Sequence, residues 1–297
     1  MEGGQGCPPS QFKRGYMSKR TIPTAAITSA IKKLAMEANF YLGDDVLTAF
    51  ERFKETEASP SARALLDQLS ENARIAADEL VPLCQDTGYA VIFADLGEDV
   101  AVDGNLKTAI EEGVRQGYKD GYLRKSILND PLRRQNTGDN TPAVIWIDIV
   151  PGDKLTLYFE PKGGGSENMS EVRGLKPADG REGVINFVVD RVKRSGGNPC
   201  PPVIVGVGIG GTFDKCAQLA KRSLLREIGR RNPDPFYADM EREILERVNK
   251  LGIGPQGLGG TTTALDVFIE AYASHIASLI CAVNIQCHSA RHKVAVL

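Results

Sequence analysis

The sequence contains no run of about 20 apolar residues, which is the length that a helix needs to cross a bilayer. Its N-terminus also lacks the basic and then apolar order of a secretory signal. We therefore expect a cytoplasmic protein without a membrane partner. Basic residues are not in excess either, since the formal net charge is −2. Composition thus gives no support for nucleic acid as a partner and favours a small ligand.

Two common signatures of metal and nucleotide sites are also missing. No two cysteines are spaced as CxxC, which excludes the usual zinc-ribbon and ferredoxin arrangements, and no GxxxxGK[ST] segment indicates a P-loop. Gly206, Gly208 and Gly211 do fit GxGxxG between an expected strand and an expected helix. A dinucleotide site also needs an acidic residue about 20 positions after the glycines, at the end of a strand, to bind the ribose. Glu227 lies near this spacing, but it falls in a helical pattern. A glycine-rich nucleotide-binding protein stays open as an alternative.

The 297 residues, 42% hydrophobic and 25% charged, have the composition of a globular protein. The leading residues 1–23 are rich in turn formers, and we expect a tag or a disordered segment there. Apolar residues recur at intervals of three and four through residues 24–80, which predicts helices. Strand and helix patterns then alternate over residues 81–297. We therefore predict an α/β (mixed α+β) fold in which a helical N-terminal region precedes a mixed-sheet body.

The elements of this body follow from apolar periodicity and turn residues. Strands are expected at 89–96, 143–150, 154–160, 201–209 and 263–272, and helices at 105–118, 213–227 and 235–250. Residues 184–192 fit either type, and 279–292 form the last segment. Pro151-Gly152-Asp153 separates two expected strands and has the residue types of a hairpin turn.

The six cysteines are spread over the whole chain: Cys7, Cys84, Cys200, Cys216, Cys281 and Cys287. Without a secretory signal, this spread favours reduced thiols over a disulfide framework. Cys84, Cys200 and Cys287 lie at junctions between expected elements, where side chains can point into a shared cleft. Cys216 and Cys281 lie in patterns typical of buried small side chains. Composition alone fits structural thiols throughout, and a metal site built from the three junction cysteines is the alternative.

Three thiolates would suit a cubane iron–sulfur cluster in which one iron has no protein ligand and acts as a Lewis acid on a substrate. Nearby polar residues fit this chemistry, because Gln85 can donate or accept a hydrogen bond, Asp86 can carry a proton and Arg124 can bind a carboxylate. Each also has a structural explanation. Asp86 lies in a turn sequence, Arg124 fits a solvated helix charge and His275 fits a structural histidine.

Six motifs occur in order along the chain: VPLCQDTG, NTGDNTPA, KGGGSENMS, NPCPPVIVGVGIGGT, LGIGPQGLGG and SHIASLICAVNIQCHSAR. Together they resemble the alpha subunit of class I fumarate hydratase and the related tartrate dehydratase, over residues 24–291. The resemblance implies a hydro-lyase that uses a 4Fe-4S cluster. It favours reversible hydration of fumarate to (S)-malate, with L(+)-tartrate dehydratase or mesaconate hydratase as the alternative.

The resemblance also implies roles for individual residues at matching positions. Cys84, Cys200 and Cys287 would hold the cluster. The dicarboxylate substrate would contact Gln85, Arg124 and one of the glycines Gly163, Gly164 and Gly165. Asp86 and His275 would handle protons.

Related single-chain enzymes have a second domain, which resembles the source of the catalytic base and of further basic substrate ligands. This chain ends at Leu297, shortly after the last motif. We therefore expect a separate beta subunit, in a heterodimer or heterotetramer, with the active site at the subunit interface. The chain alone would carry the cluster with little or no activity. A cluster-free structural subunit is the remaining alternative.

Overall fold

The computed structural model describes residues 19–297, and most of the expected leading segment, residues 1–18, lies outside this part. The described chain begins with the short strand β1 (Arg20–Ile22), which pairs in parallel with β3 (Val100–Val102). Ile22 is buried in this pairing. The folded part therefore starts before residue 24, where the sequence pattern placed its boundary.

Three helices follow, in agreement with the helical periodicity of residues 24–80: α1 (Thr24–Phe40), α2 (Asp44–Thr56) and α3 (Pro60–Glu79). Helix α3 starts at Pro60 because the Ser59 Oγ accepts a hydrogen bond from the Ala62 N–H at 3.3 Å, and because proline needs no donor at a first helical position. No helix within residues 19–297 has both the length and the apolar character to cross a membrane.

The first sheet contains β2 (Tyr89–Gly97), β4 (Val144–Val150), β5 (Leu155–Lys162) and β10 (Lys293–Val296), in the order β10-β5-β2-β4. The expected turn at residues 151–153 does join β4 to β5, but these strands do not pair with each other. Strand β2 lies between them, parallel to β4 and antiparallel to β5. It occupies this place because its residues 90–94 are all buried. The hairpin prediction is therefore corrected.

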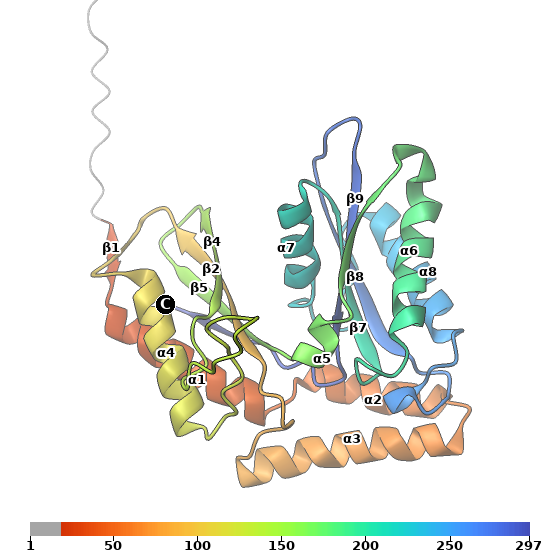
Figure 1. Ribbon diagram of the computed structural model, residues 1–297, viewed down its shortest axis with the longest axis horizontal. Coiled ribbons are helices and arrows are strands. Elements are labelled where there is room, and N and C mark those ends of the chain that lie inside the picture. The colour runs from red at the N-terminus through yellow and green to blue at the C-terminus, as the bar shows by residue number, and fades with distance from the viewer. Residues whose placement is uncertain (1–18) are drawn as a thin grey trace, which may run out of the picture.

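Helices α1 and α4 (Leu106–Asp120) cover one face of the first sheet (Figure 1). They approach each other closely because α4 carries glycines at the contact. A Cβ atom at Gly113 would lie 2.6 Å from the Ile31 side chain, and one at Gly117 would lie 2.8 Å from the Ala35 side chain. The first hydrophobic core lies between these helices and strands β2 and β5.

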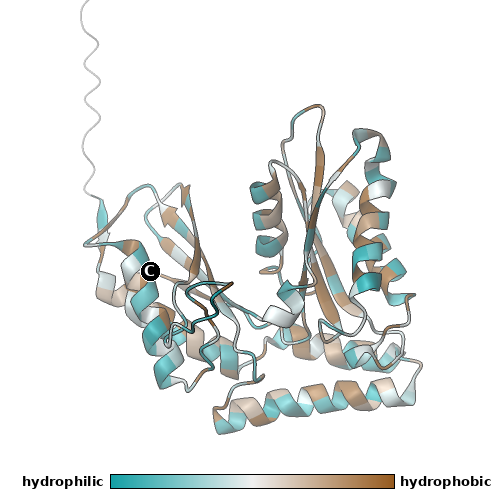
Figure 2. Ribbon diagram, in the orientation of Figure 1, coloured by the Kyte–Doolittle hydropathy of each residue, from teal (hydrophilic) through white to brown (hydrophobic). Residues whose placement is uncertain are grey.

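The second sheet contains β6 (Glu171–Leu175), β7 (Val203–Gly210), β8 (Ala264–Tyr272) and β9 (Leu279–Gln286), in the order β6-β9-β7-β8. Helices α6 (Gly180–Ser195) and α8 (Pro235–Asn249) cover one face, and α7 (Phe213–Ser223) covers the other (Figure 1). Residues 184–192 are thus helical. Figure 2 shows apolar residues concentrated along the strands of this sheet.

Two glycines of the GxGxxG pattern allow α7 to pack directly on β7. A Cβ atom at Gly206 would lie 2.1 Å from the Ala220 carbonyl oxygen, and one at Gly208 would lie 2.1 Å from the Cys216 carbonyl oxygen. Only glycine tolerates such contact between a strand and a helix backbone. Helix packing therefore accounts for both residues, which removes the sequence argument for a nucleotide site at this position.

Helices α2 and α3 run beneath the second sheet, and one end of α3 reaches toward the first sheet (Figure 1). Glu57, just after α2, attaches them to the loop before β8. Its carboxylate accepts hydrogen bonds from the Thr261 N–H at 2.9 Å and from the Thr262 N–H and Oγ1 at 2.8 and 2.6 Å. Burial raises the pKa of Glu57, but these bonds and one from the Ser59 N–H outweigh burial and lower the pKa to about 2.

We expect Glu57→Gln to destabilise the folded chain by about 1 to 2 kcal/mol at neutral pH, because the neutral amide weakens hydrogen bonds that the carboxylate accepts and solvent screens part of its charge. The folded-state pKa lies below the unfolded value of 4.5. The stabilisation is therefore present above pH 4.5 and is lost as the pH falls toward 2. Urea unfolding of both proteins across this pH range measures the effect, and a difference that does not change with pH would contradict its ionic origin.

Candidate metal centre and active site

Three cysteines from distant parts of the sequence meet between the two sheets. Cys84 lies between α3 and β2, Cys200 between α6 and β7, and Cys287 between β9 and β10. All three thiols are free. Burial raises the pKa of Cys200, and the charges of Cys287 and Cys84 raise it further, so the three thiols lie within electrostatic range of one another. The His288 N–H donates to the Cys200 carbonyl oxygen at 3.3 Å and joins two of the segments.

The path of the chain explains why these segments meet. The chain leaves the first sheet after β5, passes through the short helix α5 (Gly164–Glu167) and enters the second sheet at β6. It returns through residues 287–292 to β10 in the first sheet (Figure 1). Cys200 has a φ of +53° and an exposed side chain at the start of β7. Such left-handed backbone is uncommon for residues other than glycine and concentrates at functional sites.

Two buried cations accompany Cys287. Burial raises the pKa of its thiol, whereas the charges of Arg291 and Lys162 lower it. Arg291 is 3% exposed, and its Nη2 donates to the Asp86 carbonyl oxygen at 2.5 Å. Its Nε and Nη1 have no hydrogen-bond partner among residues 19–297. A buried guanidinium with unused donors is costly unless an anion accompanies it. Three thiols beside this cation therefore fit a thiolate-bound group of negative charge.

The three thiols do not form a site for a single ion. Within the described residues, no group of three or more His, Cys, Asp or Glu side chains is arranged to hold one metal ion. In a cubane cluster each cysteine binds a different iron, so its ligands do not have to converge on one point. Cys216 and Cys281 lie in the second sheet layer, where both are fully buried. Burial raises the pKa of Cys216 to about 11, as expected for an inert thiol.

Asp86 links the Cys84 segment to the glycine-rich turn before α5. Its Oδ1 accepts a hydrogen bond from the Gly88 N–H at 3.0 Å, and its Oδ2 accepts one from the Gly164 N–H at 2.8 Å. The Cys84 Sγ in turn accepts a hydrogen bond from the Asp86 N–H at 3.4 Å. Asp86 is therefore fixed by backbone groups on both sides.

The three glycines of the turn lie against two cysteine-bearing segments. A Cβ atom at Gly163 would lie 3.4 Å from the Asp86 Oδ2, and one at Gly165 would lie 3.7 Å from the Asn198 carbonyl oxygen, near Cys200. The family resemblance predicts that one of these glycines contacts the substrate. Their placement beside Asp86 and the Cys200 segment leaves space for a ligand to approach the backbone.

A small pocket of about 140 Å³ brings three predicted substrate and proton residues together: Asp86, Arg124 and Gly164. The Thr87 Oγ1 donates to the Arg124 carbonyl oxygen at 2.9 Å and holds the two loops side by side. Gln85 is exposed at the edge of the site, where its Oε1 accepts a hydrogen bond from the Cys84 Sγ at 3.2 Å. The Arg124 guanidinium makes this pocket suited to a carboxylate group.

His275 does not join this group of residues. It lies in the exposed loop between β8 and β9, beyond Tyr272, which pairs with Gly210 at the end of β7. Cys200 precedes the other end of this strand of 8 residues. At about 3.3 Å per residue the separation along the sheet is roughly 25 Å. Within a single chain, His275 and the cysteines therefore lie at opposite ends of the second sheet.

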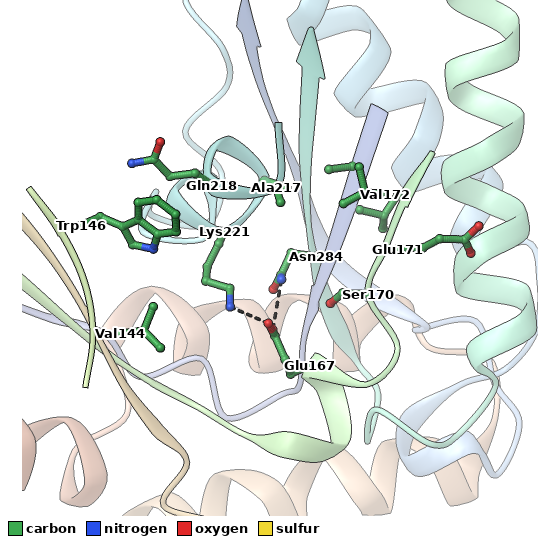
Figure 3. A pocket seen from close by; sticks show the side chains of 13 residues that line it. Val144, Trp146, Glu167, Ser170, Glu171, Val172, Ala217, Gln218, Lys221 and Asn284 are labelled. Atoms are coloured by element: carbon green, nitrogen blue, oxygen red, sulfur yellow. Dashed lines mark hydrogen bonds and ion pairs between the residues drawn. The ribbon is translucent and has the colours of Figure 1, made fainter. Parts of the chain in front are cut away.

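A second cavity, of about 260 Å³, lies between β4 and α7 (Figure 3). Trp146 and Gln218 lie close together on one side of it, and Glu167 forms its polar end. The Glu167 carboxylate accepts hydrogen bonds from the Lys221 Nζ at 2.5 Å and from the Asn284 Nδ2 at 3.1 Å (Figure 3). This cavity shares no lining residue with the pocket that contains Asp86 and Arg124, so the two pockets are separate.

Glu160 of β5 is a buried carboxyl close to this polar end. It is 2% exposed, and neither carboxyl oxygen has a hydrogen-bond partner among the described residues. Burial raises its pKa from 4.5 to about 7, although the charges of Lys162 and Lys221 act in the opposite direction. Glu160 is thus protonated in the folded chain at mildly acidic pH.

We expect Glu160→Gln to stabilise the chain at alkaline pH, by about 3 kcal/mol on the scale of 1.4 kcal/mol per pKa unit. The folded-state pKa of Glu160 lies above its unfolded value of 4.5. The wild-type chain therefore loses stability as the pH rises from 4.5 through about 7, whereas glutamine does not titrate. Denaturant unfolding of both chains over this range tests the prediction, and a gain that is equal at pH 5 and pH 8 would contradict it.

Sequence reasoning assigned no role to Arg291 or Lys162. Arg291 lies in the last motif, four residues after Cys287, and Lys162 begins the glycine-rich motif. The sequence did contain one indication of such a role, because Arg291 lies close to Cys287, a proposed thiolate ligand. Burial, which distinguishes these cations from solvated ones, is visible only in the fold.

Comparison with known proteins identifies the family of the chain. A family model described as "Fumarate hydratase (Fumerase)" matches residues 28–296. A protein of Methanocaldococcus jannaschii with the provisional name L(+)-tartrate dehydratase subunit alpha is 42% identical over 275 residues, which cover 90% of this chain and 96% of the relative. The L(+)-tartrate dehydratase subunit alpha of Escherichia coli strain UTI89 is 33% identical over 269 residues, covering 89% and 88%.

These matches define the chain as a hydro-lyase. It belongs to the class I fumarate hydratase family, which includes the tartrate dehydratase alpha subunits.

Proposed function

We propose that the chain is the iron–sulfur alpha subunit of a two-subunit hydro-lyase that acts on a four-carbon dicarboxylic acid. The meeting of Cys84, Cys200 and Cys287 beside the buried Arg291 carries this proposal. L(+)-tartrate is the first candidate substrate, because the named relatives are tartrate dehydratase subunits. Fumarate, which the sequence motifs favoured, is the second, because the family model carries its name.

Cys84, Cys200 and Cys287 would hold a 4Fe-4S cluster in this proposal. When bound, the cluster supplies an iron without a protein ligand as a Lewis acid for a substrate hydroxyl and carboxylate. Arg124 lines the pocket that also contains Asp86, so its guanidinium can bind the remote carboxylate bidentately. Asp86 would deliver a proton to the departing hydroxyl. Gln85, at the exposed edge, would donate a hydrogen bond to the substrate.

We infer that a beta subunit closes the site. The side chains of Gln85, Arg124 and Cys200 are exposed in this chain, so a substrate here would face water on one side. A partner that covers these residues would exclude water and strengthen electrostatic interactions with the substrate. The names of the relatives, which are alpha subunits, support such a partner. The beta subunit would also supply the base that removes the carbon-bound proton.

His275 could serve this site only from a second copy of the chain, because roughly 25 Å separate it from the cysteines of its own chain. The loop that carries it projects from the sheet, and its neighbour Ile276 is 94% exposed. We propose that this loop enters the site of a second alpha subunit. Mixing His275→Ala and Cys200→Ser chains in equal amounts would then restore about one quarter of wild-type activity, since random pairing gives one complete site in four. No restoration would contradict this role.

The function is tested by anaerobic purification of the chain with and without its beta partner. Iron and sulfide analysis should give four of each per chain, the stoichiometry of a 4Fe-4S cluster. Turnover of L(+)-tartrate, fumarate, (S)-malate and mesaconate should then appear only when both subunits are present. A colourless, iron-free chain after anaerobic reconstitution would overturn the cluster, and robust turnover by the chain alone would overturn the need for a beta subunit.

A further inference from the structure

Lys162 and Arg291 connect the cysteine-bearing segments through hydrogen bonds. The Lys162 Nζ donates to the Ile285 carbonyl oxygen at 2.8 Å, two residues before Cys287, and to the Ser166 Oγ at 2.8 Å in α5. Arg291 donates to the Asp86 carbonyl oxygen, two residues after Cys84. Each cation thus fixes the backbone two residues away from a cysteine.

The Lys162 backbone also lies against the first cysteine segment. A Cβ atom at Gly88 would lie 2.7 Å from the Lys162 carbonyl carbon and oxygen, so only glycine fits there. Tyr89, the next residue, pairs with Lys162 in the first sheet. Lys162 therefore contacts the Cys84 segment through its main chain and the Cys287 segment through its side chain.

The charges of the pair are only partly neutralised. Lys162 is fully buried and forms an ion pair with Glu167 at 3.4 Å, and Glu167 also pairs with Lys221. The charge of the buried Glu160 acts on Lys162 as well. Arg291 forms no salt bridge within residues 19–297, and two of its nitrogens have no partner there. The buried charge of Arg291 therefore favours an anion beside it.

We propose that Lys162 and Arg291 act as positioning residues that set the geometry of Cys84 and Cys287 and stabilise the negative charge of a thiolate-bound cluster. This inference rests on the proposed function. The Lys162 side chain reaches the backbone two residues before Cys287, and Arg291 lies four residues after Cys287. Charge and hydrogen bonding around cluster sulfurs also set reduction potentials, so loss of a nearby cation should make reduction harder.

Lys221 offers a matched control. It carries the same charge and pairs with the same carboxylate, Glu167, but its ammonium group faces the separate cavity between β4 and α7 (Figure 3). Within residues 19–297 the Lys221 Nζ bonds to Glu167 and to none of the cysteine-bearing segments. Removing the Lys221 charge should therefore leave the cysteine site unchanged.

The test compares Lys162→Gln, Arg291→Gln and Lys221→Gln in the full chain after anaerobic reconstitution. Glutamine keeps a donor at position 162 but removes the charge. The readouts are iron and sulfide content, the midpoint of cluster reduction followed by electron paramagnetic resonance, and the rate of iron release to a chelator. We expect release to be roughly tenfold faster in the first two variants, as for other outer ligands of metal sites, with a lower reduction midpoint. Lys221→Gln should match wild type, and Arg291→Lys should restore part of the loss.

Wild-type release rates and midpoints in both Lys162→Gln and Arg291→Gln would overturn the proposal. Equal shifts in all three variants would also overturn it, because they would indicate a general charge effect. If both variants are already unfolded before reconstitution, as judged by circular dichroism, their role is structural and the proposal fails. A wild-type chain that takes up no cluster would instead overturn the proposed function.

Discussion

Replacement of Cys200 by serine should lower kcat/KM of the reconstituted alpha–beta enzyme by roughly 10³-fold or more, because a Lewis-acid metal supplies several kcal/mol to the transition state. Cys200 is the most exposed of the three junction cysteines and occupies the loop before β7. Serine has nearly the same size as cysteine, so the loop should keep its conformation. The loss should appear in iron content as well as in turnover.

Cys281→Ala is the matched control for this prediction. Cys281 is fully buried in β9, in the core of the second sheet. Loss of its sulfur should cost about 1 kcal/mol of stability, as for other small core truncations. Iron content and turnover should stay at wild-type levels. Equal loss of iron in both variants, or full activity of Cys200→Ser, would contradict the assignment of Cys200.

Replacement of Asp86 by asparagine should lower kcat by about 10²- to 10⁴-fold, which is the usual effect of removing a general acid or base. The backbone bonds from Gly88 and Gly164 fix the carboxylate in the pocket beside Arg124. Asparagine can keep one of these bonds, but its amide cannot exchange a proton with the substrate at neutral pH. Iron content should be little changed.

Asp234→Asn separates this effect from the loss of a local hydrogen bond. The Asp234 Oδ1 accepts a hydrogen bond from the Phe236 N–H at 2.9 Å at the start of α8, and asparagine serves equally well as an N-cap. Its activity should equal that of the wild type. An Asp86→Asn enzyme that keeps more than about a tenth of wild-type kcat would rule out proton transfer by Asp86.

The fold was predictable where local patterns decide the structure. The three-residue and four-residue periodicity of residues 24–80 identified the helical region, and Ser59-Pro60 marked the start of α3. The placement of β2 between β4 and β5 was not predictable. The turn residues 151–153 predict that the chain reverses direction there, but they do not predict which strands pair with each other. Strands β1, β3, β6 and β10 are three to five residues long, too short for a clear pattern.

The site was predictable from the junction positions of its cysteines and from the motifs around them. The structure brings Cys84, Cys200 and Cys287 together, and it places Asp86, Arg124 and Gly164 around one pocket. Their roles stay predictions. Spacing alone could not place His275, because β9 lies between it and Cys287 and carries the two residues to opposite ends of a sheet. The buried cations Lys162 and Arg291 become visible only when the sheets are assembled.

The return of the chain from the second sheet to the first has a consequence for biosynthesis. Every strand of the second sheet lies between β5 and β10 in the sequence, so the second sheet interrupts the first. While the ribosome is still making this insertion, the first sheet lacks β10. Cys287 reaches the other two cysteines only on the segment that leads to β10. Nascent chains therefore expose Cys84 and Cys200 before Cys287 joins them, and in the proposed enzyme we expect iron and sulfide to enter after the docking of β10.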